Sequence, residues 1–103
     1  MKAIKINAEK QTVELIEWEN LENLQKEIGG YIETVNVRNL TGHLLLVDEE
    51  GRFKDIIHFF SIVGVNSYIV GNALVVGVNE SGDFKEPTCT TEDIEDIIGF
   101  ISI

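Results

Sequence analysis

The chain has 103 residues, of which 44% are hydrophobic and 25% charged, which is the length and composition of one folded domain. Its 8 Lys and Arg residues stand against 18 Asp and Glu residues, so the formal net charge is −10. This charge argues against unspecific binding to nucleic acid or to an anionic membrane. A single Cys excludes a disulfide within the chain. We therefore predict one acidic domain over residues 1–103.

The first third of the chain predicts two strands followed by a helix. Residues 2–6 and 12–18 are rich in Ile, Val and Leu, and the polar segment between them is typical of a hairpin turn. Asn20 is a favourable N-cap for a short helix over residues 21–28. Gly29 and the glycine after it end this helix, because a glycine after the last turn adopts positive φ without strain.

The middle of the chain predicts strands whose pairing is not fixed by the sequence. Residues 31–37 alternate in polarity, and residues 43–47 form a continuous apolar run that is typical of a central strand. The acidic segment 48–51 ends in a glycine and predicts a hairpin turn, with a return strand starting at residues 52–54. Residues 55–65 fit either a buried helix or a strand.

The last third predicts two strands and a final helix. Strands are expected at residues 67–70 and 72–78, with a turn at 79–82. Thr90 and Asp93 have the spacing of a capping box. The helix that follows has its apolar stripe at Ile94, Ile97, Ile98 and Ile101. We predict an α+β fold: a mostly antiparallel sheet of about five to seven strands, one short helix after the second strand, and a C-terminal helix packed on one face.

Motifs for chemistry are absent from the sequence. No glycine-rich phosphate-binding motif occurs, and His43 and His58 have no metal-ligand partner at helical spacing. Cys89 lies among acidic residues, which raise the pKa of a thiol and make it a poor nucleophile. The triplet that starts at Asp48 lacks the spacing of a calcium loop. We therefore predict no catalytic residue, no metal site and no cofactor.

Two sets of residues are candidates for binding. The first is an acidic surface that could act as a nucleic-acid mimic, if its carboxylates are spaced like phosphates. Its members are Glu80, Asp83, Glu86, Glu92, Asp93, Glu95 and Asp96. The second is a pocket for a small signalling nucleotide, which needs basic or aromatic residues. Its candidate residues are Tyr31, Arg38, Arg52 and Lys54.

The chain resembles the family of small phage and bacterial proteins called domain of unknown function 3846. The resemblance is carried by the opening residues 1–6, the run Gly-Gly-Tyr-Ile-Glu at 29–33, the segments 47–51 and 69–77, and residues 91–94. In place of the family's Pro-x-Asn segment after the acidic turn, this chain has residues 57–60, Ile-His-Phe-Phe. The resemblance implies a cytoplasmic accessory protein of a mobile element or its host, and it transfers no catalytic residue.

These observations leave a small enzyme as one alternative and three binding functions beside it. The first is a non-catalytic interaction module with a protein partner, and the others are the nucleic-acid mimic and the nucleotide sponge. A lone Cys89 and the absence of a signal sequence in the segment 1–7 predict a cytoplasmic protein. The negative charge predicts that it contacts neither nucleic acid nor membrane directly. Phe59, Phe60 and Ile62 predict exposed apolar surface, so self-association is a further alternative.

Overall fold

The structure is a computed structural model that describes residues 1–102, with the side chain of residue 102 left out. Strands predominate in this part of the chain, and every strand pair is antiparallel. In chain order the elements are β1 (Lys2–Asn7), β2 (Thr12–Glu17), α1 (Leu21–Ile28), β3 (Ile32–Val35), β4 (His43–Asp48), the 3-10 helix η1 (Gly51–Phe53), β5 (His58–Ile62), β6 (Ile69–Val70), β7 (Ala73–Val78), β8 (Phe84–Lys85), α2 (Thr91–Glu95) and β9 (Ile98–Ser102).

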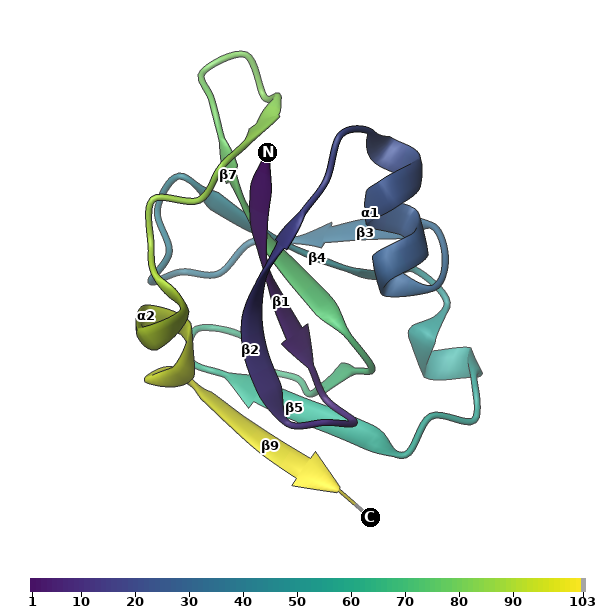
Figure 1. The fold of residues 1–103 in the computed structure, drawn as a ribbon. Helices are drawn as coiled ribbons and strands as arrows, with labels where there is room; N and C mark the ends of the chain where they lie inside the picture. The colour runs from purple at the N-terminus through teal and green to yellow at the C-terminus, as the bar shows by residue number, and fades with distance from the viewer. Residues whose placement is uncertain (103) are drawn as a thin grey trace.

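The strands form two sheets. The large sheet has the order β2-β1-β7-β4-β3, and β8 adds to it by pairing with β7. The small sheet has the order β6-β5-β9. Val75 of β7 pairs with Ile4 on one side and with Leu45 on the other, so β7 is the centre of the large sheet. Figure 1 shows the β5–β9 pair and α1 on different sides of this sheet.

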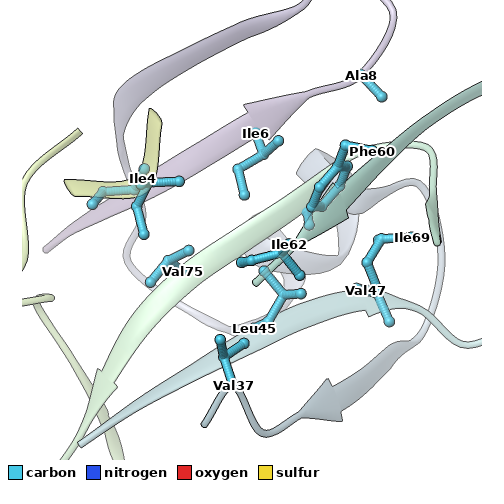
Figure 2. Close-up of a cluster of buried hydrophobic side chains, with 12 residues drawn as sticks. Ile4, Ile6, Ala8, Val37, Leu45, Val47, Phe60, Ile62, Ile69 and Val75 are labelled. Atoms are coloured by element: carbon cyan, nitrogen blue, oxygen red, sulfur yellow. The ribbon is translucent and has the colours of Figure 1, made fainter. Parts of the chain in front are cut away.

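The large sheet is covered on both faces because its strands are apolar at successive positions. Ile4 and Val75 belong to a buried cluster that includes Phe60 and Ile62 of the small sheet. This cluster fills the space between the two sheets (Figure 2). Ala3 and Leu74, which precede Ile4 and Val75 in the sequence, belong to a second cluster on the other face. Leu24 and Ile28 of α1 complete that second cluster, so the fold has three layers: helix, large sheet and small sheet.

Local sequence sets both ends of α1. The side chain of Asn20 accepts a hydrogen bond from the backbone N–H of Asn23 over 3.0 Å, and the Asn23 side chain accepts from the Asn20 backbone. Gly29 ends the helix with φ of 90° and donates its N–H to the carbonyl of Gln25. Each cap satisfies a backbone group that the helix itself leaves unpaired.

The long C-terminal helix predicted by the isoleucine stripe is wrong. The capping box of Thr90 and Asp93 is present, but α2 ends at Glu95. β9 follows it and pairs with β5, with Ile98 opposite Ile62 and Phe100 opposite Phe60. Pairing with a strand 40 residues away in sequence (Phe60 to Phe100) overrides the helical spacing, because alternation now packs Ile98 and Phe100 on the core.

The return strand predicted after the acidic turn is also wrong. β4 ends at Asp48, residues Gly51–Phe53 form η1, and the neighbours of β4 are β3 and β7. The ambiguous segment 55–65 contains a strand, β5, and no helix. Phe60 and Ile62 are 0% and 3% exposed, so they cannot supply the self-association surface that the sequence suggested.

Among residues 1–102 no helix is both long and apolar enough to cross a lipid bilayer.

Candidate ligand-binding groove

The small sheet has an outer face whose side chains belong to neither of the two buried clusters of the described chain. Strand alternation directs the buried Phe60 toward the core, so Phe59 faces outward. Val70 and Ile101 are the cross-strand partners of Phe59 and share this face. β5, β6 and β9 contain no Asp, Glu, Lys or Arg, although 25% of the chain is charged. The outer face is therefore the uncharged surface of a strongly acidic protein.

A groove lies where this face meets η1. Its volume is about 550 Å³, and its walls combine the apolar face with two basic side chains. We call it the Arg52 groove, and it is lined by Gly51, Arg52, Lys54, Ile56, Phe59, Ser67, Tyr68, Val70 and Ile101. A second hollow of about 200 Å³ adjoins it and shares Arg52, Ser67 and Tyr68 among its walls. No carboxylate lines the Arg52 groove itself.

Arg52 supplies the free cation of the groove. Its Nη2 donates a hydrogen bond to Oγ of Ser67 over 3.0 Å, and this acceptor is neutral. In the described part of the chain Arg52 forms no ion pair. Tyr68, the neighbour of Ser67, is 62% exposed and lines the same groove as Arg52, so an aromatic side chain is accessible there. A planar cation next to an accessible aromatic ring suits a ligand that has both an anionic group and a flat ring.

Lys54 has a structural role at the other wall. Its Nζ donates to the carbonyl of Gly29 over 3.0 Å and forms an ion pair with Asp48. The Asp48 side chain is 6% exposed and also accepts the N–H of Glu50. Lys54 thereby ties the segment after η1 to the C-terminal end of α1, where a cation is electrostatically favourable. Its charge is compensated, which leaves Arg52 as the cation available to a ligand.

A larger hollow beside α1 has a different character. Its volume is about 810 Å³, and it lies among the start of β1, the end of β2 and α1. Lys5 in its wall is paired with Glu27 over 2.9 Å, and the N-terminal amine is paired with Glu17. Lys26 also lines this hollow without an ion pair in the described chain, but Glu17, Glu19 and Glu27 share the same walls, unlike the walls of the Arg52 groove, which hold no carboxylate.

Two of the four predicted pocket residues line the groove. Arg52 and Lys54 do so. Tyr31 is 71% exposed and lies next to α1, with its carbonyl accepting the N–H of Glu49. Arg38 is exposed in the loop after β3, and its backbone lies against Gly64. The structure therefore places Tyr31 and Arg38 outside the Arg52 groove.

The candidate pocket predicted from the sequence does not include the aromatic side of the groove. Phe59 and Tyr68 line it from β5 and from the residue before β6. One sequence signal could have revealed this side of the groove: residues 56–79 contain no Asp, Glu, Lys or Arg. A neutral stretch this long in an acidic chain indicates surface kept free of charge as well as core.

The predicted acidic residues lie on two elements. Glu80 and Asp83 belong to the hairpin between β7 and β8, which projects from the large sheet (Figure 1). Glu92, Asp93 and Glu95 lie on α2. All seven members of the predicted surface are exposed, and none forms an ion pair with another residue of the described chain.

A histidine, the thiol and a carboxylate come together near α2. Nε2 of His43 accepts the backbone N–H of Thr88 over 3.0 Å and that of Cys89 over 3.4 Å, while Nδ1 lies 3.1 Å from the carbonyl of Thr41. Burial, and to a lesser extent the charge of Asp93, raises the pKa of the Cys89 thiol. The imidazole is thus engaged with backbone groups and the thiol stays protonated at neutral pH, so this trio lacks an activated nucleophile.

His58 is the first residue of β5. Its Nδ1 is buried and has no hydrogen-bond partner in the described structure. No set of three or more His, Cys, Asp or Glu side chains is arranged to hold a metal ion within residues 1–102.

Comparison with known proteins identifies a family and no characterised relative. The family model described as Domain of unknown function (DUF3846) matches residues 1–99. No curated protein and no solved structure matches the chain.

Proposed function

The chain belongs to the DUF3846 family, whose description gives no function, and from the geometry we propose that it is a non-catalytic binding module for a small anionic ligand with a flat ring. The binding site is the Arg52 groove. A nucleotide is the ligand class that meets both conditions, with a phosphate for the guanidinium and a base for the aromatic wall.

The observation that carries this proposal is the charge of the groove. The chain has a net charge of −10, yet its groove is lined by no carboxylate and by two cations, of which Lys54 is paired with Asp48 and Arg52 has no ion pair in the described chain. Because the rest of an acidic protein repels anions, a cation without a carboxylate partner is where an anion is least disfavoured. Arg52 meets this condition, since it is bonded only to the neutral Ser67 among the contacts described.

The dimensions and chemistry of the groove agree with a small ligand. Its volume of about 550 Å³ lies within the range of about 300–1,000 Å³ that is usual for small-molecule sites. Phe59, Val70 and Ile101 give an apolar floor from three adjacent strands. Tyr68 adds an exposed ring at the rim, on which a base could stack.

Calorimetric titration with a panel of probes tests the proposal. The panel contains mononucleotides, cyclic and dinucleotides, the corresponding uncharged nucleosides, and inorganic phosphate. We expect at least one nucleotide to bind, and nucleoside and phosphate alone to bind more weakly. Arg52→Gln should lower that affinity by about tenfold or more, since a charge-assisted hydrogen bond contributes about 1.5–3 kcal/mol.

A matched control separates the groove from general electrostatics. Arg38→Gln removes the same charge from an exposed arginine outside the groove. It should leave nucleotide affinity unchanged. If the two variants weaken binding equally, or if no nucleotide in the panel binds, the Arg52 groove is not the site we propose.

The chemistry near α2 supports the non-catalytic part of the proposal. Raised pKa and partial burial disfavour Cys89 as a nucleophile, and His43 is held by backbone groups on both ring nitrogens. A general base needs a free nitrogen within reach of the proton that it removes. If changing His43 or Cys89 abolished nucleotide binding, the region near α2 would not be separate from the Arg52 groove.

A second candidate is that the acidic surface captures a protein that normally binds nucleic acid. The observation in its favour is that its seven carboxylates are exposed and form no ion pair in the part of the chain that the structure describes. Capture of a DNA-binding protein should then weaken steeply with added salt. Glu92→Gln, Glu95→Gln and Asp96→Asn together should abolish it, whereas Arg52→Gln should not.

A further inference from the structure

We propose that two copies of this chain pair through β9, edge to edge, so that their small sheets become one continuous antiparallel sheet. This inference rests on the strand edges and is independent of any ligand in the Arg52 groove. β9 is an outer strand of the small sheet, with β5 as its single neighbour among the described strands.

β9 differs from the other sheet edges in lacking protection. Natural edge strands avoid unwanted pairing through short length, charged side chains or proline. β2 and β3 are edges of the large sheet and carry glutamates, and β6 and β8 are two residues long. β9 has five residues, Ile-Gly-Phe-Ile-Ser, with no charge and no proline. Because each copy carries a net charge of −10, a strand that itself holds no carboxylate is where two copies repel each other least, although Glu95 and Asp96 lie just before it.

The backbone of β9 presents hydrogen-bonding groups to the open side. The N–H of Val63 donates to the carbonyl of Ile97 over 2.9 Å, which fixes that position as a hydrogen-bonded pair of the β5–β9 ladder. In an antiparallel ladder such pairs alternate, so Gly99 and Ile101 direct their backbone groups toward β5. The N–H and C=O groups of Ile98, Phe100 and Ser102 then face the open edge.

One register uses all of these groups. An antiparallel pair of identical strands has a two-fold axis, and centring that axis on Phe100 aligns Ile98 with the partner's Ser102. The three open-edge residues of each copy then pair completely. Gly99 lies opposite the partner's Ile101 on the outer face, where a Cβ on Gly99 would come near only Oγ of Ser61, at 3.2 Å. The glycine leaves room for the partner's isoleucine, and it extends the apolar floor of the groove across the two copies.

Sedimentation equilibrium of the full chain, from micromolar to millimolar concentration, is the first test. We expect a monomer–dimer equilibrium that salt strengthens, since both copies are acidic. Ser102→Pro removes one open-edge N–H from each copy, and neither N–H bonds to β5. The dimer therefore loses two hydrogen bonds and should weaken by about tenfold or more. Ser102→Ala keeps the N–H and is the matched control, with no expected effect.

An intermolecular NOE identifies the interface in the unmodified chain. In a mixture of labelled and unlabelled copies, the Hα of Gly99 should show an NOE to the Hα of the partner's Ile101, because directly opposite residues in a non-hydrogen-bonded pair are the closest. This measurement decides the question even if Ser102→Pro does not fold. A monomer at all concentrations, or a dimer without this NOE, overturns the proposal.

Discussion

Arg52 donates a hydrogen bond from Nη2 to the hydroxyl oxygen of Ser67 over 3.0 Å, and so connects η1 to the segment before β6. The bond joins the two rims of the Arg52 groove. It also holds the guanidinium beside Tyr68 while leaving its charge uncompensated. An arginine in this arrangement is positioned by a neutral partner and remains available to an anion.

Ser67→Ala tests whether this bond matters to the fold or only to the groove. Because the bond is exposed, water replaces it, and we expect the free energy of unfolding to change by less than about 0.5 kcal/mol. Nucleotide affinity should persist, since the charge of Arg52 remains. Urea unfolding and calorimetry check both. A loss of affinity as large as that of Arg52→Gln would mean that positioning, and not charge, dominates.

Gly30 and Asp48 form a close contact that can be tested by a double-mutant cycle. A Cβ on Gly30 would lie 2.7 Å from Oδ1 of Asp48, whose side chain is 6% exposed and paired with Lys54. We expect Gly30→Ala to destabilise the fold by about 1–3 kcal/mol through this overlap. Most of that cost should disappear when Asp48 is already alanine, although Asp48→Ala is itself destabilising. Additive effects in urea unfolding would contradict the contact.

His43 anchors the segment that precedes α2. Its Nε2 accepts the N–H groups of Thr88 and Cys89. His43→Ala removes this partner, and because the Thr88 contact is exposed, water can replace it; we expect a loss of about 0.5–1 kcal/mol. Hydrogen exchange at the Thr88 amide should accelerate more than at Ile94 in the buried turn of α2. Unchanged exchange at Thr88 would show that the ring does not hold this segment.

Cys89 should react slowly with a thiol-alkylating reagent at neutral pH. Burial and then Asp93 raise its pKa, so the thiolate fraction is small and grows as the pH rises. Asp93→Asn removes the negative charge, lowers the pKa and should accelerate alkylation by a few fold, because burial is the larger cause. Asp96→Asn removes a charge from the other end of the same helix and is the control. Fast alkylation of the unmodified chain would contradict the inert thiol.

Elements fixed by local chemistry were the ones that the sequence could predict. α1 follows from Asn20 at its start and Gly29 at its end, and both caps act within a few residues. β9 could not be predicted in this way, because Ile94, Ile97, Ile98 and Ile101 match helical spacing. Its conformation depends on pairing with β5, a contact between distant parts of the chain. Non-local pairing is not visible in a residue pattern.

The groove was predictable only in part, for the same reason. Arg52 and Lys54 are recognisable as rare cations in an acidic chain. Their partners Phe59 and Tyr68 are distant or unremarkable in sequence, and they join the site because the small sheet turns one face outward. Tyr31 and Arg38 have suitable chemistry but lie elsewhere on the surface, so residue type alone did not identify the site.

Amide chemical-shift mapping with the tightest-binding nucleotide of the panel tests the central claim most directly. The account predicts shifts that saturate together and cluster at Arg52, Ser67, Tyr68 and Ile101, and that vanish in Arg52→Gln. Shifts that cluster instead on α2 or on the hairpin between β7 and β8, or no saturable shifts with any nucleotide, would contradict it.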